Sequence, residues 1–510
     1  MRKIIIVGGG TAGWMTAAGL AFYTRGKAAQ IQLIESEEIG IVGVGEATIP
    51  PIQEFNNLIG VDLGEFVRRT KATFKLGIEF VNWTRLGHRY FHQFGFHGDQ
   101  FDDGHESVYL HHHLMKLQQN GDRTELADYC LEAVAARQGR FALPDRGVPM
   151  MGPPLQHAYQ FDASLYGRYM RDLAEAKGVQ RIEGKITEIH QHGEDGSILG
   201  VTLQNGTRYD ADFFVDCSGF QGLLIEKTLK SGFEDWSHWL PCDRAFAVPC
   251  ESVEDITPFT RSTAHKAGWQ WRIPLQHRTG NGHVFCGSFM SEDEAAGILL
   301  KNLDGRPLAD PRLLKFTAGR RKKMMNKNVA AIGLASGFLE PLESTSIHLV
   351  QTCIQRLGTL FPLDKPDPAT EREYNRLGAE EYEHIRDFII LHYCATERAD
   401  SPFWNHCRTM ELPDSLQHRI ELFKSRGRVA RHFGQLFKEP SWVAVFLGQG
   451  IIPEAYHPLV DAFPLSDIKQ SLGLIRERIQ RYVPTLPRHR DFLASAFAPE
   501  APAGQARIPA

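Results

Sequence analysis

The chain contains few cysteines, little net charge and no long apolar run. Its 510 residues include eight scattered cysteines, without a Cys-x-x-Cys pair or the spacing with histidines that zinc sites use. Lysine and arginine total 57 against 61 aspartates and glutamates, a net charge of -4, which gives nucleic acids and anionic membranes no bulk electrostatic attraction. We therefore expect reduced thiols, no metal, no nucleic acid or membrane partner, and a small molecule as ligand.

No apolar run is long enough to span a bilayer. The N-terminal apolar stretch at 4–7 leads into glycines instead of a signal-peptide cleavage pattern, so we expect a cytoplasmic location. The three adjacent histidines at 111–113 would point in different directions on a helix, which argues against a shared metal ion. The length is enough for one large core with insertions or for two to three domains.

A glycine-rich nucleotide-binding fingerprint begins at Gly8. The apolar stretch at 4–7 predicts a strand, and the sequence GGGTAG that follows opens a predicted helix. In this arrangement Gly8 allows a tight turn, Gly10 lets the backbone approach a pyrophosphate, and Gly13 permits close packing of the helix. The positive end of the helix would then face the anion.

The next predicted strand, at 31–34, ends at Glu35, about twenty residues after the glycines. A carboxylate there can accept hydrogen bonds from ribose hydroxyls, while Thr11 and Ala12 lie at the helix start where a pyrophosphate would bind. A glycine turn without a nucleotide is the weaker alternative, because strand, glycines, helix and acid occur together. The fingerprint by itself leaves NAD and FAD open.

Two later segments favour FAD and an interleaved core. Residues 213–219 form an apolar stretch followed by Asp-Cys-Ser-Gly, and they resemble the segment by which two-domain flavoproteins return to the nucleotide module. Residues 329–335 predict a strand that runs into a glycine turn, similar to the flavin-ring contact of aromatic hydroxylases. The large separation of these segments implies a substrate-binding region inserted between nucleotide-binding segments.

A tryptophan pair lies in the stretch WQWRIP at 269–274. Side chains two positions apart on a strand point the same way, so Trp269 and Trp271 can form one aromatic wall of a flavin pocket. Pro274 would end the strand. For the pair taken alone, an ordinary strand with two buried indoles is an equally supported alternative.

Five motifs occur together in the order that is typical of flavin-dependent halogenases. They are GGGTAGW at 8–14, GVGEATIP at 43–50, TFKLGIEFVNW at 73–83, WQWRIP at 269–274 and FLEPLESTSIHL at 338–349. On these motifs the chain resembles the tryptophan-halogenase-like family over about residues 1–460. The resemblance implies an α/β fold with α+β insertions, namely a Rossmann-like FAD-binding fold of the aromatic-hydroxylase and halogenase type.

The resemblance also suggests how the chain is divided. Residues 1–365 would form an FAD-binding module with an interleaved substrate-binding region. Residues 366–496 would form a mostly helical C-terminal region that completes the substrate site, because apolar residues there recur at helical spacing. Residues 497–510, rich in proline and alanine, would form a disordered tail.

The reaction is implied by the resemblance as well. A separate NAD(P)H-dependent flavin reductase would supply reduced FAD (FADH2), which with oxygen and chloride or bromide would yield hypohalous acid. The oxidant would then halogenate an electron-rich aromatic ring held in another pocket. The glycine-rich GVGEATIP segment would form a mobile loop over the flavin and couple flavin binding to halide binding.

Catalytic residues are carried over one by one. Lys75 matches the family's essential lysine, which either hydrogen-bonds hypohalous acid or forms a haloamine with it. Its neighbours Phe74 and Leu76 are apolar, which is unusual for a surface lysine. Glu343 matches the second essential residue, which could orient the ammonium, polarise hypohalous acid or accept the proton that the ring loses. Ser344 matches its hydrogen-bonding neighbour. Helix capping by Glu343 and Ser344 alone is the alternative.

Ligand-binding residues follow from the same motifs. Thr345 and Ser346 match the halide site, where backbone N–H groups near a helix start can hold an anion. Several family members carry glycine at the position of Ser346, so this chain departs from the pattern there. The further flavin contacts that the resemblance implies are Ala47, Ile186, Leu334 and Ile347.

The substrate side departs from the family pattern. His92 and Phe94 match residues that sandwich the substrate indole, with ordinary core packing as an equally supported alternative. In tryptophan halogenases a segment near the end of the chain grips the amino acid with paired tyrosines, but the corresponding stretch at 432–442 is short and lacks them. We therefore expect indole, an indole derivative or a carrier-bound substrate, not free tryptophan.

Two alternatives to a halogenase are open at this point. One is a flavin monooxygenase that hydroxylates an aromatic ring directly, and the other is a non-catalytic flavin-binding protein. Retention of Lys75 and Glu343 argues against the second. The sequence leaves undecided the native substrate, the carbon attacked, chloride or bromide, and monomer or homodimer.

Overall fold

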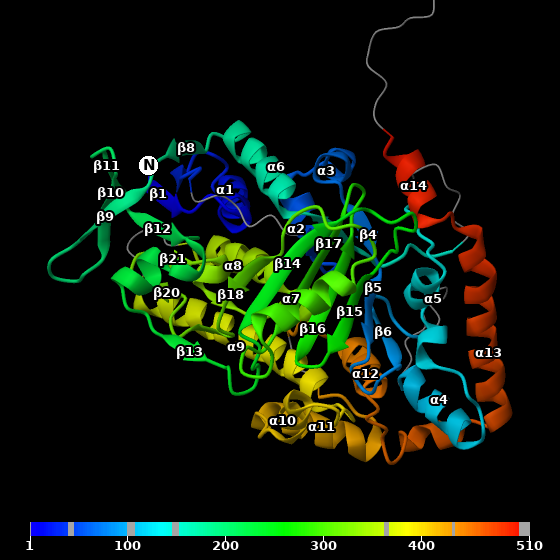
Figure 1. Ribbon diagram of the computed structural model, residues 1–510. Coiled ribbons are helices and arrows are strands. Elements are labelled where there is room, and N and C mark those ends of the chain that lie inside the picture. The colour runs from blue at the N-terminus through cyan, green and yellow to red at the C-terminus, as the bar shows by residue number, and fades with distance from the viewer. Residues whose placement is uncertain are drawn as a thin grey trace, which may run out of the picture.

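A computed structural model describes residues 2–38, 45–98, 108–144, 152–361, 367–430 and 434–498. The nucleotide-binding end carries the N-terminus, a large β-sheet occupies the middle, and C-terminal helices close the other end (Figure 1). The first part of the GVGEATIP loop, part of the 432–442 segment and most of the expected tail lie outside the described residues.

Six of the described strands form the sheet that the glycine fingerprint predicts, in the order β20-β21-β12-β1-β2-β8. All neighbours are parallel except β20 and β21. The strands are β1 (Arg2–Val7), β2 (Ala29–Glu35), β8 (Gln180–Glu183), β12 (Phe213–Asp216), β20 (Met325–Asn326) and β21 (Val329–Ala331). Because these strands come from distant parts of the chain, the interleaved Rossmann-like fold is confirmed.

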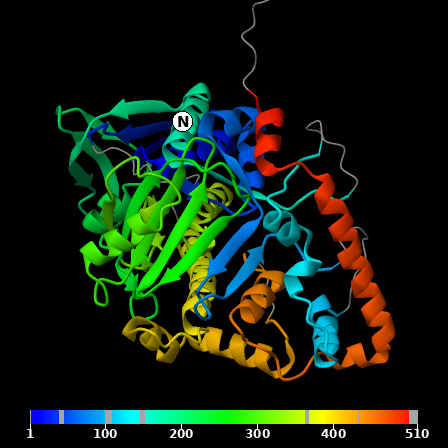
Figure 2. The same ribbon diagram turned by 45° about the vertical axis from the view of Figure 1, so that its right-hand side comes forward.

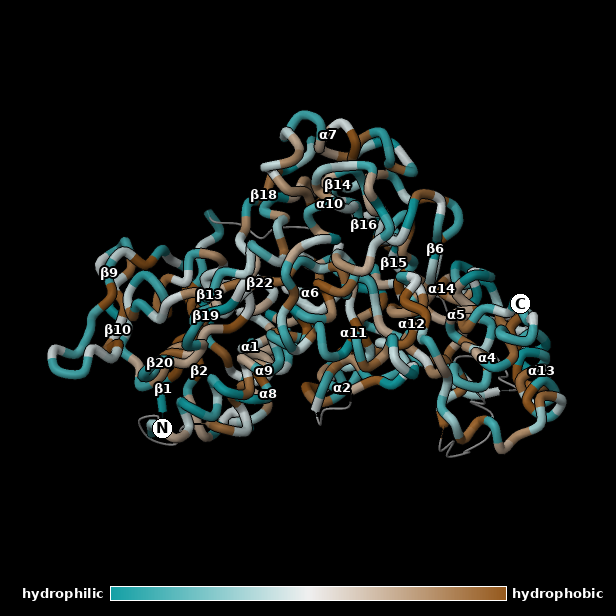
Figure 3. The backbone as a smooth tube through the Cα atoms, turned by 90° about the horizontal axis from the view of Figure 1, so that it is seen from below, coloured by the Kyte–Doolittle hydropathy of each residue, from teal (hydrophilic) through white to brown (hydrophobic). Residues whose placement is uncertain are grey.

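Helix α1 (Thr11–Tyr23) follows β1 directly and is buried along most of its length. It packs between α6 (Ala163–Ala176) and α8 (Ser346–Thr359), which belong to later segments of the chain. A hairpin-like sheet of β9 (Ile186–Gln191), β10 (Ile198–Leu203) and β11 (Arg208–Asp210) projects beside this layer. Its β9–β10 loop is mostly hydrophilic, as expected for a solvent-exposed connection (Figure 3).

Seven described strands form the central sheet in the order β18-β14-β17-β16-β15-β5-β6. They are β5 (Gly77–Val81), β6 (Arg89–Gln93), β14 (Arg244–Cys250), β15 (Thr260–His265), β16 (Gly268–Pro274), β17 (Thr279–Phe285) and β18 (Arg312–Lys315). Strand β16 contains the WQWRIP stretch and is buried throughout. Helix α9 (Pro368–Cys394) runs along one face of this sheet (Figures 1 and 2).

Two small sheets connect the larger layers. One consists of β3 (Gly45–Ala47), β7 (Ala158–Asp162) and β4 (Thr73–Lys75), and it carries Lys75 on an edge strand. The other consists of β13 (Phe233–Asp235), β19 (Gly319–Arg321) and β22 (Gly337–Phe338), and it leads into the turn before α8.

The remaining helices surround these sheets, with the C-terminal ones gathered at the end opposite the nucleotide-binding sheet (Figure 2). They are α2 (Ile52–Ile59), α3 (Leu63–Thr70), α4 (Leu110–Gln119), α5 (Leu131–Arg137), α7 (Glu292–Lys301), α10 (Pro402–Thr409), α11 (Asp414–Arg426), α12 (Glu439–Gly448), α13 (Leu465–Tyr482) and α14 (His489–Ala496). Within the described ranges, we find no helix with the length and apolar character that a bilayer crossing requires.

Candidate active site

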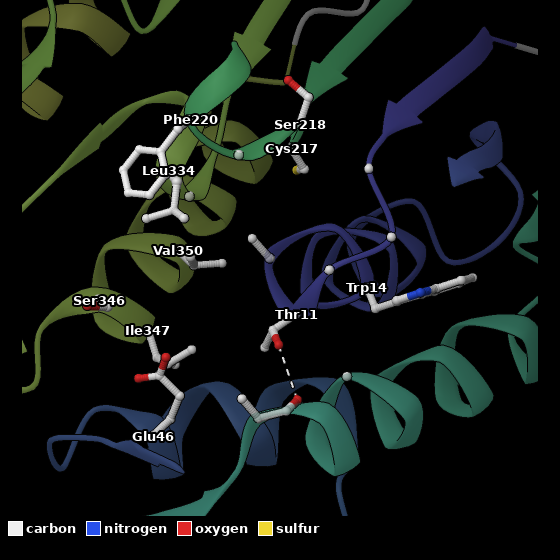
Figure 4. Close-up of a pocket in the computed structure, with 18 of the residues that line it drawn as sticks. Thr11, Trp14, Glu46, Cys217, Ser218, Phe220, Leu334, Ser346, Ile347 and Val350 are labelled. Carbon is white, nitrogen blue, oxygen red and sulfur yellow. Dashed lines mark hydrogen bonds between the residues drawn. The ribbon is translucent and has the colours of Figure 1, made fainter. Parts of the chain in front are cut away.

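A cavity of about 880 Å³ opens at the carboxyl ends of the parallel strands. Val7, Glu35 and Cys217, at or next to the ends of three neighbouring strands, line it together with the backbone of Gly8–Thr11. Open parallel sheets bind nucleotides at this edge. The cavity continues to α8, where Ile347 and Val350 face the start of α1 (Figure 4).

The glycines of the fingerprint fit a bound dinucleotide. A β-carbon at Gly8 would lie 2.3 Å from Cys217 O, and one at Gly13 would lie 1.8 Å from Gly8 O, so the turn and the helix contact require glycine. At Gly10 a β-carbon would meet no atom within 4 Å and would enter the cavity instead. Gly10 also gives α1 no side-chain cap, which leaves N–H groups for a pyrophosphate.

Glu35 lies where a ribose is expected, but it already has protein donors. Arg181 Nε and Trp14 Nε1 donate to its two oxygens, and Arg171 Nη1 lies 3.8 Å away. A carboxylate has about four acceptor positions, so ribose hydroxyls can still be accepted beside these partners. Its side chain crosses Gly9, where a β-carbon would lie 1.5 Å from the carboxylate.

Of the predicted flavin contacts, all but Gly13 lie on the cavity, and Gly13 packs against Gly8 instead. The cavity-lining residues include Thr11, Ala12, Ala47, Ile186, Leu334 and Ile347. Leu334 and Phe220 expose 38% and 46% of their surface at the cavity, which a flat ring system would cover. Phe220 was not among the predicted contacts.

The two tryptophans predicted to form one wall differ in their surroundings. Trp271 lines the cavity, whereas Trp269 is fully buried and is not among the lining residues. The ring centroids lie 6.1 Å apart. Trp269 lies away from the cavity because its Nε1 donates a 2.6 Å hydrogen bond to the buried Glu340.

Lys75 is fully buried at the end of β4. Its Nζ donates to Ser344 Oγ at 2.7 Å and to Thr48 O at 3.1 Å, and it lies 5.0 Å from the ring centre of Phe94. Burial lowers the pKa of Lys75 to about 7, against the opposing charge of Glu343. Both the ammonium and the amine are therefore accessible near neutral pH.

Glu343 is held between two imidazoles. His92 Nδ1 lies 2.8 Å from Oε2, and His392 Nε2 lies 2.8 Å from Oε1. Burial by itself would raise the pKa of Glu343, but the charges and hydrogen bonds of His92 and His392 outweigh it and lower the pKa to about 2. The ring of His392 is also held on its other side, because its Nδ1 lies 2.8 Å from Phe388 O.

The segment between β22 and α8 connects the cavity with Lys75. Ser344 has a φ of +59° and follows the single 3-10 turn Pro341–Glu343. Its Oγ accepts from Lys75 while the residue also lines the cavity. Helix α8 has Thr345 at its N-cap without a side-chain cap, so capping by Glu343 and Ser344 is not what these residues do.

The two predicted halide residues occupy the start of α8. Thr345 is fully buried, and its Oγ1 has no hydrogen-bond partner within the described part of the chain. Ser346 is the first residue of α8 and lines the cavity. Glu46, which was not predicted, points toward Ile347 in the same region, and burial raises its pKa to about 7 (Figure 4).

His92 and Phe94 lie next to an aromatic cluster on the other side of the turn. The rings of Phe388 and Phe437 are stacked at 3.9 Å, and their centroids lie 5.6 Å and 6.2 Å from that of His92. His92 hydrogen-bonds Glu343 through Nδ1. Its other ring nitrogen, Nε2, is buried and has no hydrogen-bond partner among the described residues.

Sequence reasoning missed His392, Thr48 and Phe388. Thr48 contributes only a backbone oxygen, which carries no sequence signal. His392 does carry one, because it is a polar residue directly after the buried apolar run 388–391 of α9. His111, from the histidine triplet, hydrogen-bonds Gly427 O through Nε2. Among the residues that the structure describes, no group of three or more His, Cys, Asp or Glu side chains has a metal-binding arrangement.

The fold and the cavity define a dinucleotide-binding protein. The model of the tryptophan halogenase family matches residues 3–465, so the chain belongs to that family. Tryptophan 7-halogenase RebH from Lentzea aerocolonigenes is 31% identical over 96% of this chain and 98% of its own. The family confirms a flavin-dependent halogenase and decides against a hydroxylase or a non-catalytic protein.

Solved structures agree with this membership. A flavin-dependent halogenase from Xanthomonas campestris is 48% identical, with a TM-score of 0.92 over 96% of this chain and 97% of that one. BrvH, a flavin-dependent halogenase from Brevundimonas sp. BAL3, is 43% identical, with a TM-score of 0.91 over 97% of this chain and 99% of that one.

Proposed function

We propose that this halogenase uses reduced FAD, oxygen and chloride or bromide to halogenate an electron-rich aromatic ring, with Lys75 relaying the halogen. One observation carries the proposal. Lys75 Nζ is buried, donates to Ser344 on the cavity side and lies 5.0 Å from the ring of Phe94 on the other. A primary amine in that position can receive an oxidised halogen from one compartment and present it to a ring in the next.

FAD would be held by the glycine turn, by Glu35 and by the apolar residues Ile186, Leu334 and Ile347. Bound in its reduced form, it would supply the electrons with which oxygen and a halide yield hypohalous acid. A separate NAD(P)H-dependent reductase would provide the reduced flavin, since one dinucleotide fingerprint is evident in the sequence. The halide would bind at Thr345 and Ser346, where the N–H groups at the start of α8 favour an anion.

Lys75 and Glu343 would divide the chemistry. The lowered pKa of Lys75 makes a neutral amine available near pH 7, as a haloamine requires, while the ammonium can donate to hypohalous acid. Glu343 stays ionised because of its two histidines, so it can accept the proton that the ring releases. His92 orients Glu343 through Nδ1 and, with Phe94, would hold the substrate ring.

Indole or an indole derivative is our proposed substrate. The segment at 432–442 lacks the paired tyrosines that grip an amino acid, and its Phe437 stacks on Phe388 beside His92. These groups are apolar or already paired, which suits a ring without a charged head group. Free tryptophan is the competing substrate, because RebH is a tryptophan 7-halogenase.

The test is a turnover assay with purified protein, FAD, NADH and a flavin reductase. Indole and tryptophan are offered in parallel, each with bromide, with chloride and without halide, and products are identified by mass spectrometry. We expect halide-dependent halogenated indole, formed faster than halogenated tryptophan. A hydroxylated product that forms without halide would contradict the proposal, and equal turnover of tryptophan would contradict the assigned substrate class.

A further inference from the structure

Glu340 is a second buried carboxylate close to Glu343. It is fully buried, and its Oε2 accepts two hydrogen bonds of 2.6 Å, from Trp269 Nε1 and from Tyr393 Oη. A carboxylate without such partners would be very costly to bury. The two short bonds therefore fix Glu340 in one position relative to strand β16 and helix α9.

Glu340 belongs to the turn that carries the proposed base. It is the N-cap of the 3-10 turn Pro341–Glu343, and its carbonyl accepts from Leu342 N at 2.8 Å. The two carboxylates of this turn are held by successive residues of α9, because His392 contacts Glu343 and Tyr393 contacts Glu340. The last turn of α9 thus contacts the side chains at both ends of the 3-10 turn.

The partners of Glu340 are themselves fixed by packing. Trp83 lies 6.4 Å from Trp269, 5.3 Å from Tyr393 and 5.7 Å from Trp404, measured between ring centroids. Trp269, Trp83 and Trp404 are fully buried, so their rings have little room to move. A displacement of the 3-10 turn would have to break the hydrogen bonds of Glu340 with Trp269 and Tyr393, whose rings are held in place by this packing.

The arrangement tolerates either protonation state of Glu340. Burial raises the pKa of Glu340 to about 7, against its hydrogen bonds from Tyr393 and Trp269. The proton of the acid form would sit on Oε1, which has no partner among the described residues. Oε2 could still accept from both donors.

We infer that Glu340, Trp269 and Tyr393 are positioning residues that hold Glu343 and Ser344 in register with Lys75. The inference rests on the proposed relay. Ser344 must stay within hydrogen-bond distance of Lys75 for the halogen to pass from the flavin cavity to the amine. If the turn moves, the oxidant leaves as free hypohalous acid before it reaches the ring.

The experiment measures how the oxidised halogen is partitioned. Wild type, Trp269→Phe and Tyr393→Phe are compared with FAD, a reductase, bromide and indole. Brominated indole is quantified beside the hypohalous acid captured by a cyclic diketone trap. Losing one hydrogen bond to a buried carboxylate should lower the ratio of brominated indole to trapped acid about tenfold. The dissociation constant for FAD should stay at its wild-type value.

Matched controls remove similar bonds elsewhere. Trp236→Phe deletes an indole N–H that donates to Glu234 at 3.0 Å, and Tyr166→Phe deletes a buried hydroxyl that donates to Asn56 at 2.9 Å. Both should keep the wild-type ratio. Hydrogen exchange of the FAD-loaded protein gives a second measurement, because residues 341–346 should exchange faster in Trp269→Phe than in Trp236→Phe.

Substitution of the carboxylate itself separates positioning from general stability. Glu340→Gln keeps an acceptor oxygen and should retain most of the ratio, whereas Glu340→Leu should lose it. Adding Trp269→Phe to Glu340→Leu should change nothing further, because the shared bond is already gone. A lower turnover with an unchanged ratio and unchanged exchange at 341–346 in Trp269→Phe would overturn the inference.

A failure of the proposed function would give a different result from a failure of the positioning role. If wild type makes neither brominated indole nor trapped hypohalous acid, the relay is wrong. The exchange comparison at 341–346 then decides the positioning role alone. Faster exchange in Trp269→Phe, but not in Trp236→Phe, would support it, and equal exchange would overturn it.

Discussion

Lys75 Nζ donates a 2.7 Å hydrogen bond to Ser344 Oγ, although the two residues are 269 positions apart in the chain. Ser344 lines the cavity that would hold FAD, and Lys75 lies outside it next to Phe94. This bond connects the two compartments that the proposed reaction needs. Its two ends come from an edge strand and from the turn before α8.

Lys75→Ala should abolish halogenation of the ring and leave FAD binding intact. The amine that hands over the halogen is lost, while none of the cavity-lining groups changes. We expect product formation to fall by at least about a hundredfold, with hypohalous acid still detected by a diketone trap. The exposed Lys266, which pairs with Glu294, offers the control Lys266→Ala. Product at a near-native rate in Lys75→Ala would reject the relay.

Lys75→Met should stabilise the protein at pH 7, and the gain should shrink toward pH 10. The folded pKa of about 7 lies below the ordinary value of 10.5, so between these values the unfolded chain binds more protons. Wild-type stability therefore rises with pH across this window, and methionine removes that dependence. Denaturant midpoints of the two proteins at pH 7, 8.5 and 10 provide the measurement, with Lys266→Met as control. A gain that grows with pH would contradict the lowered pKa.

Gly10→Val and Gly13→Val should fail in different ways. Gly10 has a φ of −70°, which any residue adopts, and its β-carbon would enter the open cavity. We expect Gly10→Val to unfold at the wild-type denaturant concentration but to bind FAD at least about tenfold more weakly, a loss of about 1.4 kcal/mol. Gly13→Val should lower the stability by about 1–3 kcal/mol, because its side chain would collide with Gly8 O. Tight FAD binding by Gly10→Val would place the pyrophosphate elsewhere.

Acid should weaken the attachment of α14 to the strand of Lys75. His489 Nε2 accepts from Phe74 N at 3.1 Å, and its Nδ1 donates to Ile256 O at 3.0 Å. Burial lowers the pKa of His489 to about 4, so the folded form is favoured when the ring is neutral. The stability that neutral His489 contributes is complete above its unfolded pKa and is lost as pH falls from about 6.5 toward 4. At pH 5 the loss in the free energy of unfolding is about 2 kcal/mol.

His489→Gln isolates this contribution, since glutamine can accept and donate without titrating. We expect the loss of stability between pH 7 and pH 5 to be smaller in His489→Gln than in wild type, as followed by urea unfolding. His238 is exposed, and His238→Gln should behave as wild type. An identical acid sensitivity of wild type and His489→Gln would show that other histidines dominate.

The double variant His92→Ala, Phe94→Ala should separate substrate binding from oxidant formation. We expect the KM for indole to rise about tenfold or more because aromatic packing is lost, while trapped hypohalous acid increases. Phe22, whose ring meets that of Tyr23 edge to face, supplies the control Phe22→Ala. Retained affinity for indole in the double variant would remove the proposed ring sandwich.

Much of the fold was readable from local patterns. The apolar run before Gly8, the acid at Glu35 and the strand at 213–216 predicted an interleaved Rossmann-like module, and the structure pairs these strands in one parallel sheet. These signals are readable because a buried parallel strand and a glycine turn each impose a strict residue pattern over a few positions. The helical character of the C-terminal region was also readable, from apolar residues at helical spacing, and α9 lies within that region.

The tryptophan pair marks the limit of such patterns. Spacing predicted that Trp269 and Trp271 leave the strand together, but it could not tell which ring lines the cavity. That is decided by Glu340 and Tyr393, which approach Trp269 from other segments. In the same way, the apolar run 388–391 marks His392 as unusual, but no local pattern predicts that it contacts Glu343.

The sequence by itself determined the nucleotide-binding sheet, the family and the identity of Lys75 and Glu343 as candidates, because short motifs encode backbone geometry and chemical type. Tertiary structure alone decided which groups lie within hydrogen-bond distance of Glu343, which ring faces the cavity and how far the amine lies from Ser344. Burial and charge act through space, so the pKa of a lysine or a glutamate depends on neighbours hundreds of positions away.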